Sequence, residues 1–194
     1  PGVGSGESAG RRLLTMSLRE SLTLADALRG RARHSPWRPT GQCRRPSAGI
    51  RPWLSVNTSL TRRLEEAYGP VRVVLLRQQA GLPLQDEETA ARRPCVTRDV
   101  VLESVAGRPL VLAHSVLPLC PRGLLHPLVR RLGRQALGSL LFTRPGFERR
   151  QREWAILDKR HPLYRLAQTI HGETLPTRIW ARRACFSQIR SRLQ

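Results

Sequence analysis

Long hydrophobic runs and aromatic side chains are scarce in this 194-residue sequence. No apolar stretch approaches the roughly 18 residues that a membrane-crossing helix needs, so we expect no membrane span. Aromatic residues make up 5% of the chain, which leaves little material for stacking on nucleic-acid bases. Hydrophobic residues make up 40%, an ordinary level for a globular protein, and the length suits one domain with its own core.

Paired cysteines are also missing. The four cysteines stand far apart and form no C-x-x-C pair: Cys43, Cys95, Cys120 and Cys185. His114, Cys120 and His126 follow one another at intervals of six, which matches no common zinc spacing. We therefore expect free thiols in a reducing, cytoplasmic compartment, and neither a metal nor an organic cofactor.

Lysine is almost absent: the chain has 34 basic residues, and all of them except Lys159 are arginine. The net charge of +20 invites a nucleic-acid interpretation. However, an arginine excess beside abundant Leu, Ala, Gly and Pro is typical of a GC-rich coding sequence, and here it is spread along the chain. We expect no nucleic-acid partner; a nucleic-acid binder would lose affinity steeply with salt, whereas a buried small-acid site would keep it.

Familiar catalytic motifs do not occur. The chain has no Gly-rich phosphate loop, no G-x-S-x-G elbow and no H-E-x-x-H. Asp86-Glu87-Glu88 has the pattern of a solvated loop rather than of a paired acid and base. Any chemistry must therefore come from isolated polar residues in an otherwise apolar setting.

The composition divides the chain into an extension and a domain. Residues 1–47 are rich in Gly, Ser, Pro and Arg, which predicts a disordered segment with at most a short helix over 17–29. Residues 48–194 alternate between helix and strand patterns without a βαβ repeat, which predicts a single α+β domain built on an antiparallel sheet. The expected helices are 59–69, which Thr58 or Ser59 caps and Gly69 ends, 123–142 and 161–170. The expected strands are 70–79, 95–117 as a hairpin, 147–157 (strand or helix) and 179–189.

The hairpin at residues 95–117 organises the domain. Val105-Ala106-Gly107 suits a three-residue loop with glycine at positive φ, and this register sets Arg98 directly opposite His114. A two-residue loop would instead set Arg98 against Ser115. We favour the first register because of Gly107.

Arg98 belongs to the more apolar face of this hairpin, and a buried charge without a partner costs about 3–5 kcal/mol. Three partners are possible: a carboxylate from elsewhere in the fold, solvent at the edge of the sheet, or an anionic ligand. Arginine suits a planar carboxylate because its fork can donate two parallel hydrogen bonds. In the favoured register His114 becomes a second donor beside it.

Four sequence blocks resemble the chorismate lyase family, in the family's order and over roughly residues 50–190. They are SLTRRL at 59–64, VVLESVAGRPLVLAHSVLP at 100–118, LGRQALGSLLFT at 132–143 and HPLYRLA at 161–167, with WARR at 180–183 in support. The resemblance implies a single antiparallel sheet with helices covering one face. It also implies a cytoplasmic, cofactor-free enzyme of ubiquinone biosynthesis that converts chorismate into 4-hydroxybenzoate and pyruvate, and we expect it to be a monomer.

The resemblance also implies site residues. The family arginine that binds the ring carboxylate falls on Arg98, and Leu60 and Leu137 fall on positions that line the ligand. The family's second arginine is replaced by His114, a weaker and pH-dependent cation, which we expect to bind substrate and to take part in catalysis with Arg98.

A further departure concerns the end of the sequence. After WARR the family continues into a last strand with a glutamate that meets the ring oxygen, and no residue of this sequence carries that role over. The alternative hypothesis for the function is a non-catalytic domain of the same fold that binds a small acidic effector, as in GntR-type regulators. We recognise no helix-turn-helix pattern before this domain.

Overall fold

The computed structural model describes residues 35–87, 95–118, 132–133, 135–138, 141 and 147–188. The predictions for the extension up to residue 34 and for most of the helix at 123–142 lie outside this range. The helices are α2 (Arg51–Leu54), α3 (Leu60–Tyr68) and α6 (Pro162–His171), followed by the 3₁₀ turn η1 (Gly172–Thr174). The strands are β1 (Arg38–Pro39), β2 (Val71–Gly81), β3 (Cys95–Ser104), β4 (Pro109–Pro118), β5 (Phe147–Leu157) and β6 (Ile179–Gln188).

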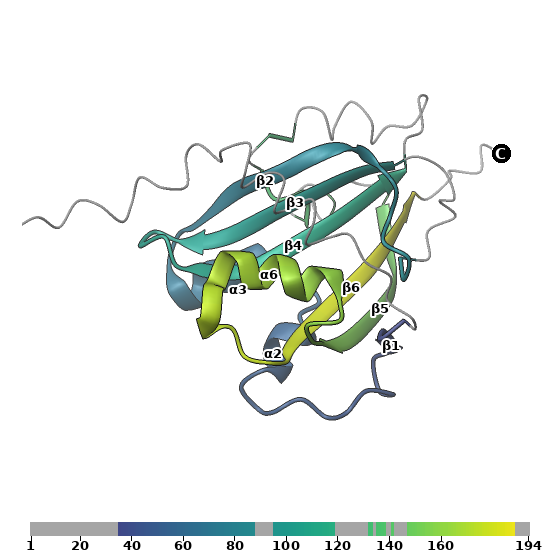
Figure 1. The fold of residues 1–194 in the computed structure, drawn as a ribbon, viewed down its shortest axis with the longest axis horizontal. Helices are drawn as coiled ribbons and strands as arrows, with labels where there is room; N and C mark the ends of the chain where they lie inside the picture. Colours follow the sequence, from purple (N-terminus) through teal and green to yellow (C-terminus); the bar gives the residue numbers. More distant parts are fainter. Residues whose placement is uncertain are drawn as a thin grey trace, which may run out of the picture.

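The described strands form two antiparallel sheets, with the orders β2-β3-β4 and β1-β5-β6. The expectation of a single sheet is therefore corrected for this part of the chain. In Figure 1 β6 runs at an angle to β4, and the two are not paired. Alternating side chains predict that a strand exists and which face it buries, but they carry no signal for which edges join.

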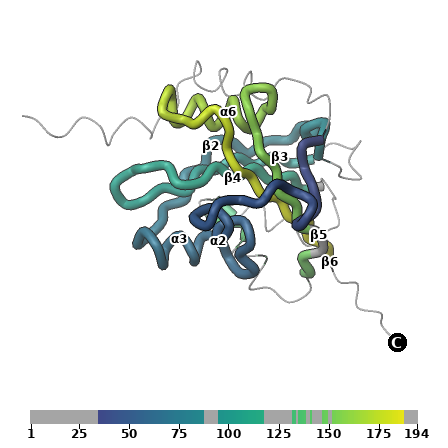
Figure 2. Tube along the Cα trace, turned by 90° about the horizontal axis from the view of Figure 1, so that it is seen from below, coloured from purple at the N-terminus to yellow at the C-terminus, as the bar shows by residue number. Residues whose placement is uncertain are grey.

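Helices lie on both sides of the sheets, so the expected coverage of one face is also corrected (Figure 2). On one side Tyr164 of α6 packs in a buried cluster with Ala155 and Leu157 of β5. On the other side the indole Nε1 of Trp154 donates to the carbonyl of Leu54 in α2, at 3.2 Å. Because Trp154 and Ala155 are successive residues of a strand, they must point to opposite faces.

Local sequence signals explain the helix ends. The side chain of Ser59 accepts from the amide of Arg62 and caps α3, which ends at Gly69 with φ of 76°. The predicted start and stop of this helix are confirmed. In α6, His161 caps the first turn through Nδ1, which accepts from the amide of Leu163 at 3.1 Å. No helix in the described residues is long and apolar enough to cross a membrane.

The hairpin has the predicted turn but not the predicted register. Gly107 has φ of 76°, its amide donates to the carbonyl of Ser104, and Glu103 pairs with Pro109 as expected. The next pair is Leu102 with Val111, so Leu110 is an extra residue that forms a β-bulge.

The bulge shifts every later pair by one position. Arg98 pairs with Ser115, and Asp99 pairs with His114. The prediction that Arg98 faces His114 is therefore wrong, although the loop on which it rested is right. A shift of one residue moves a whole strand's side chains to the other face, so His114 and Arg98 lie on opposite faces of the sheet.

Candidate anion-binding site

Arg98 lies in the middle of the central strand β3, with 1% of its surface exposed. Its face of the strand also carries Val96, Val100 and Leu102. The strand is β-branched and apolar on this face, which explains both its pairing on two sides and its burial. A guanidinium has thus been placed within an apolar surface.

The guanidinium of Arg98 is held by main-chain carbonyls. Its Nη2 donates to the carbonyl oxygens of Gly133 and Gln135, both at 2.9 Å. Its Nε is buried, and no described residue accepts a hydrogen bond from it. No carboxylate of the described ranges forms an ion pair with this side chain, and burial lowers its pKa. Of the three partners considered from the sequence, the described structure supplies neither solvent nor a carboxylate.

The opposite face of β3 holds a compensated charge cluster. Asp99 is fully buried and forms two ion pairs. Its Oδ2 lies 2.8 Å from Nη2 of Arg77, and its Oδ1 lies 2.5 Å from Nδ1 of His114. Nε2 of His114 lies 3.2 Å from Oε1 of Glu87, as an ion pair without good hydrogen-bond geometry. Two cations therefore meet two carboxylates, and the cluster is formally neutral when His114 is protonated.

The environment of His114 favours its protonated form. Burial alone would lower its pKa, but the hydrogen bond with Asp99 and the attraction of Glu87 raise the pKa to about 9. His114 is therefore a cation at neutral pH that is engaged by its own chain. The geometry does not bring it to Arg98 as a second donor.

The two faces point to different helices. Glu87 contacts His114 on the Asp99 face, and the residue before it is Asp86. Oδ2 of Asp86 lies 2.9 Å from Nε2 of His161 at the start of α6. The Asp99 face is thus directed to the side of α6, and Arg98 to the side on which Figure 2 shows α2 and α3. Leu60, the first residue of α3, is half-buried on that side. Leu137 is half-buried and follows two residues after Gln135, so the contacts of Arg98 bring its segment to the site.

Asp86 is not part of a solvated loop, contrary to the prediction from the sequence. It is buried and accepts from Nε1 of Trp37 at 2.6 Å as well as from His161. Burial by itself would raise the pKa of Asp86, but the bonds from His161 and Trp37 lower it overall. No sequence signal marked these partners, which lie 49 and 75 positions away.

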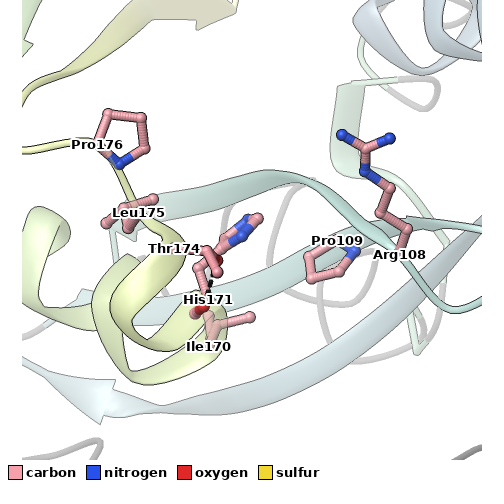
Figure 3. A pocket seen from close by; sticks show the side chains of 7 residues that line it. All are labelled: Arg108, Pro109, Ile170, His171, Thr174, Leu175 and Pro176. Atoms are coloured by element: carbon pink, nitrogen blue, oxygen red, sulfur yellow. Dashed lines mark hydrogen bonds between the residues drawn. The ribbon is translucent and has the colours of Figure 1, made fainter.

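A cavity of about 520 Å³ lies elsewhere, between the β3–β4 turn and the end of α6 (Figure 3). Its lining is mixed: the polar residues Arg108, His171 and Thr174 lie beside apolar ones such as Pro109 and Leu175. In Figure 3 the side chain of Arg108 stands beside Pro109 at the edge of the cavity, and Arg108 is exposed. This cavity therefore lacks the buried, uncompensated cation that distinguishes the surroundings of Arg98.

Fold and site together define a class of protein: an α+β domain whose antiparallel sheet buries an arginine without an acidic partner in the described ranges, as a binding site for a small acid requires. Comparison with known proteins agrees with this class. Residues 32–192 match the model of the family described as Chorismate lyase, and the chain belongs to that family.

Individual relatives cover most of the chain. It is 41% identical over 138 residues to a probable chorismate pyruvate-lyase of Dechloromonas aromatica, which spans 70% of this chain and 77% of the relative. It is 37% identical over 175 residues to a protein of the same description from Halorhodospira halophila, which spans 82% and 90%. A similar relative from Thiobacillus denitrificans is 39% identical over 142 residues.

Proposed function

We propose that this protein is a chorismate–pyruvate lyase that releases 4-hydroxybenzoate for ubiquinone biosynthesis. The proposal rests on the family, on the relatives described as probable chorismate pyruvate-lyases, and above all on Arg98. An uncompensated buried guanidinium is the group that a ring carboxylate would need. Leu60 and Leu137 would contribute apolar contacts to the ring.

The reaction needs positioning more than it needs a strong acid or base. The bond between the ring carbon and the ether oxygen of the side chain breaks, and the oxygen leaves with the side chain. The hydrogen on the neighbouring, hydroxyl-bearing ring carbon leaves as a proton. The departing enolpyruvate takes up a proton and becomes pyruvate. Because the ring becomes aromatic, the protein's main task is to hold the substrate in a reactive pose, and Arg98 would fix the carboxylate end of that pose.

His114 has a different part in this proposal from the one that the sequence indicated. Its ring is engaged by Asp99 and Glu87 on the reverse face, so it would support the strand that carries Arg98 without touching the substrate. Its contribution would be to stability and to the position of β3 and β4.

The test is to incubate the protein with chorismate and to follow both products, 4-hydroxybenzoate by absorbance and pyruvate by a coupled dehydrogenase. We expect turnover by the parent and a fall in kcat/KM of about 10²-fold or more for Arg98→Met. Arg108→Met removes an exposed arginine and serves as the matched control. An Arg98→Met protein that remains folded and binds 4-hydroxybenzoate as tightly as the parent would remove the assignment. Binding without turnover by the parent would favour the effector-binding domain.

A further inference from the structure

One row of polar side chains lies between two apolar rows on the sheet face that carries Arg98. The pairing of three strands places Gln78, Arg98 and Ser115 side by side in β2, β3 and β4. The rows on either side contain no polar side chain. They are Leu75, Val100 and Ala113 on one side, and Ala80, Val96 and Leu117 on the other.

The bonds of Arg98 limit how it can hold an acid. A guanidinium grips a carboxylate with two parallel bonds by pairing Nη2 with either Nε or Nη1. Here Nη2 already donates to two carbonyl oxygens, those of Gly133 and Gln135. The pair of parallel hydrogen bonds expected from the sequence therefore cannot form while these bonds persist. A carboxylate bound by Nε or Nη1 alone has a second oxygen that needs another donor.

We propose that Ser115 and Gln78 complete the carboxylate site, each donating a hydrogen bond to the acid that Arg98 holds. This inference rests on the proposed function and extends it. Directly opposite residues on neighbouring strands have Cβ atoms about 5 Å apart, so both side chains are within reach of an anion bound over Arg98. A hydroxyl and an amide can each donate to a carboxylate.

The bulge at Leu110 is what delivers Ser115 to this position. Without the extra residue, His114 would stand beside Arg98, and Ser115 would point to the other face. The neighbouring apolar rows give the rest of the ligand an apolar floor, and Ala113 is small enough to leave room for a ring. The row therefore selects a flat apolar body with one carboxylate at its end.

The experiment measures the affinity of Ser115→Ala for 4-hydroxybenzoate and for its neutral analogue, 4-hydroxybenzamide. We expect the variant to bind the acid about tenfold more weakly and the amide nearly as well as the parent does, because a hydrogen bond to a charged group is the stronger one. In turnover, KM should rise with kcat little changed, since the ring carboxylate persists from substrate to transition state. Gln78→Leu should show the same pattern, and Ser55→Ala provides a hydroxyl deletion outside the site.

Ser115→Thr keeps the hydroxyl, and it should retain most of the affinity for the acid if the inference is right. Unchanged binding of 4-hydroxybenzoate by Ser115→Ala, in a parent that turns over chorismate, overturns the inference and leaves the proposed function intact. An equal loss of affinity for acid and amide also overturns it, because it indicates disturbed packing. A parent that neither binds 4-hydroxybenzoate nor consumes chorismate overturns the proposed function itself.

Discussion

The charge cluster behind Arg98 predicts how the stability of the protein depends on pH. His114 has a pKa of about 9 in the folded protein, against an ordinary value of 6.5. A group with a raised folded pKa contributes all of its stabilisation below its unfolded pKa and loses it as the pH rises through the folded value. The difference in pKa corresponds to about 3 kcal/mol. The ring is 4% exposed, so solvent screens little of this contribution.

The measurement is urea unfolding of the parent and of His114→Gln at intervals between pH 6 and pH 10. We expect the free energy of unfolding of the parent to fall across this range relative to that of the variant, by about 3 kcal/mol in total. Cys95 complicates the upper end, because burial raises the pKa of its thiol and its contribution is lost in the same direction. Since both proteins contain Cys95, its effect cancels in the difference between them.

A flat difference between parent and variant from pH 6 to pH 10 would refute the reasoning. It would mean that His114 has the same pKa in the folded and unfolded states, and hence that Asp99 and Glu87 do not hold it as a cation. The glutamine variant should still be folded at pH 6, because Asp99 keeps its ion pair with Arg77. The expected loss is in stability, with the site of Arg98 retained.

Three further predictions concern other elements. Arg182→Met should lower the free energy of unfolding by about 1.5–3 kcal/mol, measured in urea, because Nη1 of Arg182 donates to two carbonyl oxygens of the segment that precedes α3. The pKa of Asp86 is lowered in the folded protein, so the stabilisation that Asp86 contributes is lost as the pH falls through that lowered value. In Asp86→Asn the free energy of unfolding, measured in urea, should therefore fall less steeply as the pH is lowered. Gly107→Ala should cost about 1–2 kcal/mol in thermal or urea unfolding, because φ of 76° strains an alanine although no atom lies within 4 Å of its Cβ.

The sequence predicts those parts of the fold that depend on local chemistry. Ser59 and Gly69 mark the ends of α3 because one accepts a free helical amide and the other adopts a positive φ. Gly107 marks the hairpin turn because it too adopts a positive φ, which glycine does without steric strain. The burial of Arg98 follows from the apolar residues that alternate with it.

The sequence does not predict features that depend on one unpaired residue or on distant partners. Leu110 looks like any apolar strand residue, yet its bulge exchanges His114 for Ser115 beside Arg98. Asp86 has a loop-like neighbourhood in sequence, and only the fold shows that Trp37 and His161 meet it. Gln78 reaches the row of Arg98 through a second irregularity, between Leu75 and Arg77 in β2.

The distribution of acidic residues gives the strongest reason to assign a ligand to Arg98. Arg98 and Asp99 are neighbours in one strand, and each is almost wholly buried. On the face of Asp99 the fold supplies two cations and a second carboxylate, so every charge there has a partner. On the face of Arg98, one residue away, the described chain supplies two carbonyls and no carboxylate. A bound acid would give Arg98 the carboxylate that Arg77 and His114 already have in Asp99, which is why we propose a ligand at Arg98.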